Sequence, residues 1–234
     1  TMLSSYAACP RRFYYRHIKH WTGAREASPA IVFGSAWHKA MDVLWRGLCG
    51  VHNPDEYAVK EEAMRAFFTE WTASNMPTSL DALRGNGDGE ALEDAEKRMR
   101  FYWPSTARAM LDAYVDTHRV ALARSTLIGI EVPFSLPLVA GAAQQICGLI
   151  DKIIVTPDGH TVPLDHKTTA AFASAGGFRY DWLDKWALNG QLIAYAFAVT
   201  LNTGKQAPFA IVDASLVHKT HFHYHKPLPI TTTA

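Results

Sequence analysis

The sequence of 234 residues predicts an α/β domain in which helices come before a β-sheet and also flank it. Three observations predict this class. Apolar residues recur at helical spacing through most of the first 123 residues, alternating β-branched runs follow from residue 127 to 168, and helical spacing then returns before the chain closes in strand-like runs. This order is typical of a helical part placed ahead of a sheet. We expect residues 1–234 to form a single domain, with 51–123 as a helical insertion or subdomain.

Four helices are expected before the sheet. The first lies within MLSSYAACPRRFYYRHIKHW, where Pro10 suits a first helical turn. The second is GSAWHKAMDVLWRGLCG, with Ser35 as its N-cap and Gly50 as its stop. Two more are expected over 55–74 and 90–123, and the stretch between them is rich in Gly, Asn, Asp and Pro, which is typical of a loop.

The strands begin with STLIGIEVPFSLPL, whose alternation predicts a strand near 127–136. A hairpin follows in GLIDKIIVTPDGHTVPLDHKT, and DWLDKWALNGQLIAYAFAVTL restores helical spacing. PFAIVDASLV and THFHYHK close the chain with one or two strands.

The hairpin carries charged residues where apolar ones would be expected. Pro157, Asp158 and Gly159 fit a three-residue loop in which glycine takes the left-handed conformation. That register places Asp151 directly opposite Asp165, with Lys167 on the same face. Two facing carboxylates destabilise a sheet unless a cation lies between them, and oxygen-only ligands suit Mg²⁺ or Mn²⁺. The alternative is an exposed polar face on which the lysine neutralises one aspartate.

The composition indicates the broad class of protein but says little about its function. Hydrophobic residues make up 48% of the chain, which argues against disorder, and no apolar run is long enough to cross a bilayer. We see no signal peptide, and the three scattered cysteines support neither a disulfide framework nor a zinc ribbon. These features predict a cytoplasmic protein, either bacterial or phage-encoded and acting in the host cytoplasm.

Five stretches, taken in order, resemble the PD-(D/E)XK nuclease superfamily. The aspartate of GLIDKI, followed after thirteen residues by Asp165-His166-Lys167, is similar to its D…(D/E)-x-K core. SSYAACPRRFYYRHI, FGSAWHKAMD and QLIAY resemble the N-terminal helix, the G-x-x-x-H helix and the Q-x-x-x-Y helix of the RecB-like exonuclease branch, which includes CRISPR-associated nucleases. The resemblance covers nearly the whole chain and implies a restriction-endonuclease-like fold with a central mixed sheet.

The resemblance implies metal-dependent hydrolysis of phosphodiester bonds. Asp151, Asp165 and the backbone carbonyl of His166 would be ligands of Mg²⁺ or Mn²⁺, and Lys167 would orient the attacking water. His38 would be a further ligand; its imidazole favours Mn²⁺, although a lone histidine is more often a residue at a helix edge. Ile150 precedes the first aspartate where the motif has proline.

Three further site residues follow from the resemblance. Gln191 and Tyr195 share one helix face and would contact the site and the DNA backbone, although such a pair could also lie on a polar rim. Glu131 resembles an acidic residue near the metals, or is a solvated strand residue. Cys9 stands where some relatives place an iron–sulfur ligand, but no cysteine follows Cys147, so we expect no cluster.

The N-terminal segment predicts DNA contacts from its own residues. The net charge is only +1, yet no acidic residue occurs before Glu26. Arg11 and Arg12 stand beside Tyr15, and cations with aromatic rings are used to bind phosphates and stack bases of single strands. The alternative is a solvated helix face with aromatic residues in the core.

The expected function is a DNA exonuclease acting on single-stranded DNA or frayed duplex ends. A structure-specific endonuclease uses the same site, and the helices of 55–123 could decide between the two by admitting only ends. A non-catalytic DNA-binding scaffold in recombination is a third reading, which the intact D-x-K motif disfavours. Protein partners in recombination, repair or CRISPR adaptation are possible, and no membrane partner is expected.

Overall fold

The structure is a computed structural model that describes residues 5–6, 8–21, 28–84, 89–137, 143–172, 177–187, 189–218 and 228–231. The strands are β1 (Thr126–Pro137), β2 (Gln145–Val155), β3 (Thr161–Thr169), β4 (Phe209–Leu216) and β5 (Leu228–Thr231). They form one sheet in the order β1-β2-β3-β4-β5, in which β3 and β4 are parallel and the other neighbours antiparallel. The predicted α/β class with a mixed sheet is confirmed.

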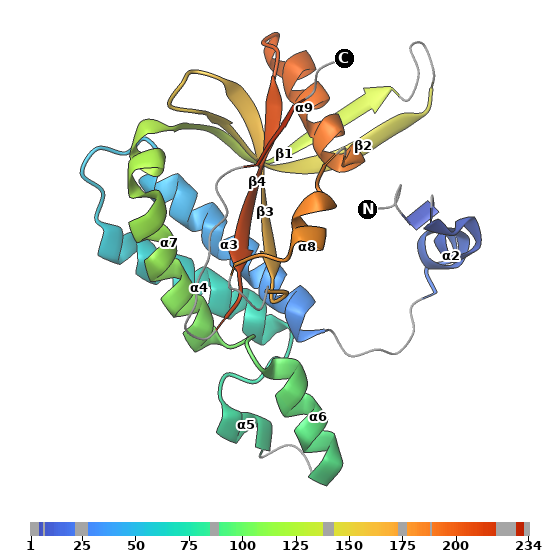
Figure 1. The fold of residues 1–234 in the computed structure, drawn as a ribbon, viewed down its shortest axis with the longest axis vertical. Helices are drawn as coiled ribbons and strands as arrows, with labels where there is room; N and C mark the ends of the chain where they lie inside the picture. The colour runs from blue at the N-terminus through green and yellow to red at the C-terminus, as the bar shows by residue number, and fades with distance from the viewer. Residues whose placement is uncertain are drawn as a thin grey trace.

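Helices cover both faces of this sheet (Figure 1). They are α2 (Pro10–Phe13), η1 (Tyr14–Ile18, a π-helix), α3 (Pro29–Leu48), α4 (Glu56–Ala73), α5 (Leu80–Arg84), α6 (Gly89–Met99), α7 (Pro104–Arg124), α8 (Tyr180–Asp184) and α9 (Gly190–Thr203). In Figure 1, α3, α4 and α7 lie on one side of the sheet and α8 and α9 on the other, while α5 and α6 project away from it. No helix in the described part of the chain is both long and apolar enough to cross a membrane.

Each face of the sheet has its own apolar core. On one face, Ile154, Leu164 and Ile211 pack with the buried sides of α3, α4 and α7. On the other, Ile153 and Val212 pack with α8 and α9. Successive residues of a strand therefore pack into the cores on opposite faces of the sheet, as the two-residue period of a strand requires. A charged residue in β2 or β3 consequently belongs to one face or the other according to its position in this alternation.

The hairpin has the predicted geometry. The Thr156 amide donates to His160 at 2.9 Å, the Gly159 amide donates to Thr156 at 2.9 Å, and Gly159 has φ +86°. Only glycine adopts this left-handed conformation without strain. The ladder continues through the pair Lys152–Leu164, so the next facing pair is Asp151 and Asp165.

Several predicted helix boundaries are wrong. α3 begins at Pro29 after Ser28, so Ser35 is not an N-cap but lies inside the helix and donates to Glu70 at 2.8 Å. Pro29 has no amide hydrogen and suits a first turn, which outweighs the Ser35 signal. Gly50, with φ +69°, does follow the helix end as predicted.

Two long predicted helices are each divided, and one predicted loop contains a helix. The helix expected over 90–123 is α6 and α7, because Pro104 starts a new helix after residues 100–103. The helix expected over 181–201 is α8 and α9, because the Asn189 side chain accepts from the Gln191 amide and caps a new start. The expected loop before residue 90 contains α5. The strand expected in THFHYHK falls on residues 220–226, outside the described residues.

Candidate active site

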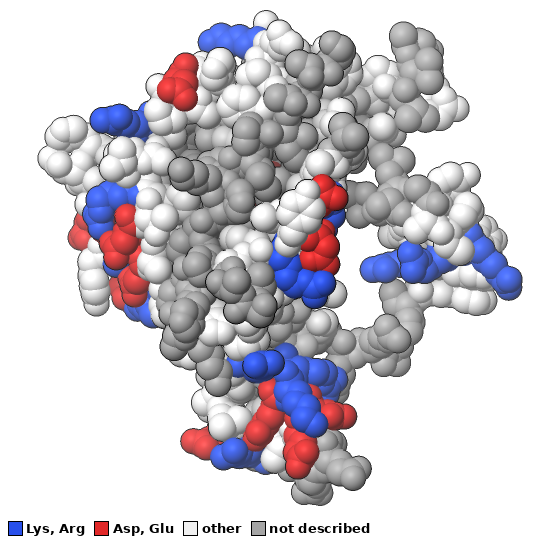
Figure 2. Space-filling model, viewed as in Figure 1, with Lys and Arg blue, Asp and Glu red and all other residues white. Residues whose placement is uncertain are grey.

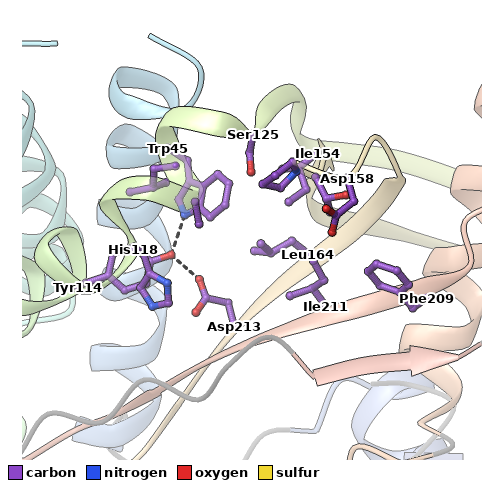
Figure 3. Close-up of a pocket in the computed structure, with 14 residues that line it drawn as sticks. Trp45, Tyr114, His118, Ser125, Ile154, Asp158, Leu164, Phe209, Ile211 and Asp213 are labelled. Carbon is purple, nitrogen blue, oxygen red and sulfur yellow. Dashed lines mark hydrogen bonds between the residues drawn. The ribbon is translucent and has the colours of Figure 1, made fainter. Parts of the chain in front are cut away.

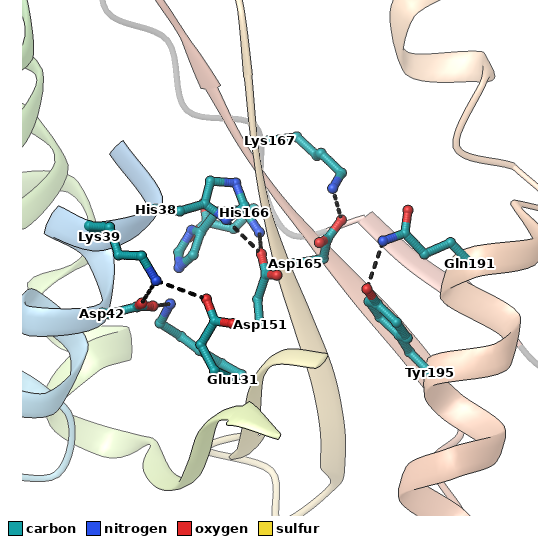
Figure 4. Close-up of polar contacts among 12 residues, drawn as sticks. His38, Lys39, Asp42, Glu131, Asp151, Asp165, His166, Lys167, Gln191 and Tyr195 are labelled. Carbon is teal, nitrogen blue, oxygen red and sulfur yellow. Dashed lines mark hydrogen bonds and ion pairs between the residues drawn. The ribbon is translucent and has the colours of Figure 1, made fainter. Parts of the chain in front are cut away.

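Two carboxylates face each other where β2 and β3 separate. Asp165 is 1% exposed, and neither of its oxygens accepts a well-aligned hydrogen bond, although Lys167 Nζ lies 2.6 Å from Oδ2. Asp151 accepts from the His166 amide at 3.2 Å. The structure therefore brings Asp151, Asp165 and Lys167 together as the sequence predicts (Figure 4).

The pKa values of the two carboxyl groups are shifted in opposite directions. Burial raises the pKa of Asp165 to about 6, and Asp151 adds to the effect while Lys167 opposes it. Burial also disfavours the charge on Asp151, but the hydrogen bond and charge of His38, with further help from His166 and Lys167, hold its pKa well below the usual range. One carboxylate is thus ionised easily and its neighbour is not, which is the expected behaviour of two acids in one desolvated site.

His38 reaches the pair from α3. Its Nδ1 lies 3.1 Å from Oδ2 of Asp151. Four residues earlier, Gly34 faces the end of β3, and a Cβ at this position would lie 3.3 Å from Oγ1 of Thr168. The absence of a side chain therefore allows close contact between α3 and β3, which brings His38 to the carboxylates. This contact gives the G-x-x-x-H spacing a structural reason.

Glu131 lies on β1 close to the same point. It has φ +52°, which is uncommon for a residue with a Cβ, and the regular pairs Ile130–Lys152 and Val132–Ile150 lie on either side of it. Its carboxylate contacts Lys39 of α3 at 3.4 Å. Between these two pairs, Glu131 lies across the β1–β2 ladder from Asp151, and its place near the metals stays a prediction.

A buried ion pair lies behind the carboxylates, and sequence reasoning missed it. Lys152 is fully buried and its ammonium contacts Asp42 of α3 at 2.8 Å. A signal was present, because strand alternation places Lys152 on the face of Ile154, and a buried lysine needs an acidic partner. Asp42 follows His38 by four residues and therefore lies on the same face of α3.

The His166 side chain is anchored on the same rear face. It is fully buried, and its Nδ1 lies 3.0 Å from Oδ2 of Asp213 on β4. The Tyr114 hydroxyl donates to the same oxygen and accepts from Trp45 Nε1 at 3.1 Å (Figure 3). Burial lowers the pKa of His166 to about 4, and contact with His166 overcomes burial to hold the pKa of Asp213 at about 2.

Burial favours the neutral form of the His166 imidazole, while its contact with Asp213 acts in the opposite direction. The contact with Asp213 also holds the backbone of His166 between Asp165 and Lys167. Asp213 was missed as well, although a lone aspartate in the apolar run AIVDASLV was a usable signal.

A cavity of about 400 Å³ opens beside this network (Figure 3). Leu164, Ile154 and Ile211 line it, so it belongs to the face that packs on α3 and α7. Asp165 points to the opposite face, because it neighbours Leu164 in β3. The cavity is therefore separate from the paired carboxylates.

Gln191 and Tyr195 lie on α9, on the side of the sheet that carries Asp165. The side-chain amide of Gln191 donates a hydrogen bond through Nε2 to the Tyr195 hydroxyl at 2.7 Å. Burial raises the pKa of Tyr195 to about 12, and the charges of the site carboxylates contribute to the rise. Both side chains thus adjoin the site in Figure 4 and touch each other, while their contact with DNA stays a prediction.

The structure does not bring the N-terminal residues to the carboxylates. Arg11 and Arg12 lie on α2 and Tyr15 on η1, and Figure 1 shows these elements set apart from the sheet. The guanidinium of Arg11 lies 5.9 Å from the centre of the Tyr15 ring. In Figure 2, the described part of this segment shows lysine and arginine without acidic residues. Its role in DNA binding stays a prediction.

The residues of the site fit a hydrated divalent cation. The buried, poorly bonded oxygens of Asp165 beside Asp151 are the kind of hard ligands that Mg²⁺ and Mn²⁺ use. Among the described residues, no three histidine, cysteine or acidic side chains are already grouped as a metal cage. A cation here would therefore also need backbone oxygen, water or substrate phosphate, which is how Mg²⁺ is usually held.

Comparison with known proteins agrees with this geometry. A family model described as the PD-(D/E)XK nuclease superfamily matches residues 1–224, which include all the site residues named above. No curated protein matches the chain. Enzymes of this superfamily use divalent metals, commonly Mg²⁺ or Mn²⁺. The matched residues and the paired carboxylates with their lysine lead to one conclusion: the chain belongs to the PD-(D/E)XK nuclease superfamily.

Proposed function

We propose that this protein is a metal-dependent DNA exonuclease of the RecB-like type that degrades single-stranded DNA or frayed duplex ends. The observation that carries the proposal is the grouping of Asp151, Asp165, Lys167 and His38 at one point of the sheet. The exonuclease mode rests on the ordered likeness of five sequence stretches to the RecB-like branch. Partners in recombination, repair or CRISPR adaptation belong to the same proposal.

In this mechanism the two aspartates, the His166 carbonyl and His38 hold the cation, with Glu131 close by. A bound divalent cation would polarise the phosphate of the substrate and lower the pKa of a bound water. Lys167 orients the attacking water and offsets the negative charge that develops on the phosphate. Its ammonium is held for this role by Asp165 at 2.6 Å. Gln191 and Tyr195 hold the DNA backbone from α9.

The N-terminal segment supports a single-stranded substrate. Trp21 is 68% exposed and stacks on Tyr15 with 4.7 Å between ring centres. The guanidinium of Arg11 lies beside the Tyr15 ring, and the ammonium of Lys19 lies 5.6 Å from the Tyr14 ring centre. Arg12 adds a further cation on α2. Aromatic faces with interspersed cations bind single strands without sequence preference.

Hydrolysis of end-labelled DNA tests the proposal. Linear single- and double-stranded DNA, labelled at the 5′ or 3′ end, would be compared with a covalently closed circle in Mg²⁺, Mn²⁺ or EDTA. We expect loss of linear DNA only, inhibition by EDTA, and a loss of at least about 10²-fold in rate in Lys167→Ala. The label released first gives the polarity.

The matched control is Lys205→Ala, an exposed lysine at the far end of α9. Cleavage of the covalently closed circle would show endonuclease activity and contradict the exonuclease proposal. DNA binding without cleavage of any substrate would leave a scaffold and refute the catalytic assignment.

His38→Ala is expected to weaken metal binding, and Mn²⁺ binding more than Mg²⁺ binding, because imidazole is a softer ligand than carboxylate. We expect the Mn²⁺ affinity measured by titration calorimetry to fall by at least about tenfold, the loss typical of removing even an outer contact to a metal ligand. His52→Ala, at an exposed position, is the control. An unchanged Mn²⁺ affinity would remove His38 from the ligand set.

A further inference from the structure

A second lysine stands beside the catalytic one. Lys185 is the C-cap residue of α8, and its ammonium lies 4.7 Å from the ring centre of Trp182 and 4.5 Å from that of Trp186. Lys167 lies 5.6 Å from the centre of the same Trp186 ring. One indole therefore lies close to two ammonium groups, one from the D-x-K motif and one from outside every matched motif.

The two tryptophans are rigid supports. Trp182 and Trp186 are 9% and 8% exposed and belong to the core that α9 shares with the sheet. Their rings contact each other edge-on at 5.5 Å, and Trp182 stacks on Phe178 at 5.2 Å. Because both rings are held by packing, they are not free to stack on bases. They can instead hold the exposed Lys185 side chain near one position by cation–π contact.

Among the described residues, Lys185 forms no ion pair. The nearby Asp181 is bound through both its oxygens by Arg179, at 3.0 and 2.7 Å. Lys167, by contrast, contacts Asp165. Burial lowers the pKa of Lys185 and repulsion from Lys167 lowers it further, while the charge of Asp181 opposes the change. Two ammonium groups lie beside one indole, and of the two only Lys167 forms an ion pair among the described residues, so the Lys185 charge is available to an anionic ligand.

We infer that Lys185 binds a backbone phosphate of the DNA strand, next to the phosphate that is cleaved, and so positions the strand across the carboxylates. This inference rests on the proposed function, since it assigns the substrate strand a path over α8. The recognised chemistry is the phosphodiester, so the contact carries no sequence preference. Lys185 acts in strand binding and not on the reacting atoms.

A purely structural role of Lys185 would predict different results for its variants. The methylene stem of Lys185 could serve only to cover the two indoles, since lysine stems commonly cover apolar surface. Lys185→Met keeps an unbranched apolar stem and removes the charge, and Lys185→Arg keeps the charge. Lys205→Met is the control, because about 20 Å of helix separates its end of α9 from the end that carries Gln191.

The test measures binding of a fluorescein-labelled oligothymidylate by anisotropy in EDTA and in Ca²⁺, at several salt concentrations. We expect Lys185→Met to weaken binding about fivefold near 0.1 M salt and to reduce the slope of log affinity against log salt by about 0.7, as the loss of one phosphate contact on a single strand requires. Lys185→Arg should restore both values and Lys205→Met should change neither. In hydrolysis, KM should rise in Lys185→Met while kcat stays close to wild type.

Unchanged affinity and salt slope in Lys185→Met would overturn the inference. A loss of thermal stability in Lys185→Met that Lys185→Arg does not reverse would also overturn it, in favour of the covering role. Binding in EDTA does not depend on catalysis. A wild type that binds DNA in a Lys185-dependent way but never cleaves it would refute the proposed function and leave the phosphate contact standing.

Discussion

Asp165→Asn is expected to abolish hydrolysis and, at the same time, to stabilise the metal-free protein. The activity falls because a charged metal ligand is lost, and such ligands supply several kcal/mol of transition-state stabilisation, or at least about 10³-fold in rate. The stability rises because Asp165, at 1% exposure and opposite Asp151, resists ionisation in the folded protein.

The direction of this change in stability follows from the pKa of Asp165. Burial raises the pKa of Asp165 to about 6, above that of an aspartate in the unfolded chain. Between these two values the folded protein binds more protons than the unfolded chain, so stability falls as pH rises through this range. At pH 7.5 the asparagine variant should gain of the order of 2 kcal/mol in its free energy of unfolding, and near pH 4 it should gain little.

Urea denaturation in EDTA and in Mn²⁺ measures both effects. The wild type should gain stability from Mn²⁺, because the ion binds only the folded protein, and Asp165→Asn should gain none. Asp158→Asn makes the same chemical change at the exposed hairpin turn and is the matched control. A metal-free Asp165→Asn protein less stable than the wild type at pH 7.5 would show that the carboxylate pair is not a source of strain.

Asp42→Ala is expected to be among the most destabilising single substitutions outside the apolar cores. It leaves the ammonium of Lys152, which is fully buried, without the carboxylate that now lies 2.8 Å away. Breaking a buried ion pair in this way costs about 3–5 kcal/mol. Since His38 and Asp42 share one face of α3, the loss should also weaken metal binding.

The double variant Asp42→Leu with Lys152→Met separates the cost of an unpaired buried charge from the cost of altered side-chain packing. Replacing both charges by apolar groups removes the unpaired cation, and such replacements are often neutral or stabilising. We expect the double variant to recover most of the free energy lost in Asp42→Ala, as measured by urea denaturation. If Asp42→Ala costs less than about 1 kcal/mol, the range of an exposed pair, then Lys152 has another way to remain charged or to reach solvent.

The class of the sheet, the hairpin and the facing acid pair could all be predicted from the amino-acid sequence. Turn chemistry predicted the hairpin, because Pro157, Asp158 and Gly159 favour a three-residue loop over a two-residue one. The two-residue period of strands then puts Asp151 opposite Asp165. Long-range packing was not needed for that inference. Helix ends were less predictable: Pro29, Pro104 and Asn189 each start a helix that apolar spacing alone placed elsewhere.

The residues that support and surround this pair could not be predicted without the packed fold. Asp42 and Lys152, and likewise Tyr114 and Asp213, are far apart in the sequence, and no local pattern states that they meet. Lys185 is similar, since its place beside Lys167 depends on how two tryptophans of α8 pack against α9 and the sheet. Turns and strand periods act over a few residues and can be read from the chain, whereas partners brought together by burial exist only once the cores have formed.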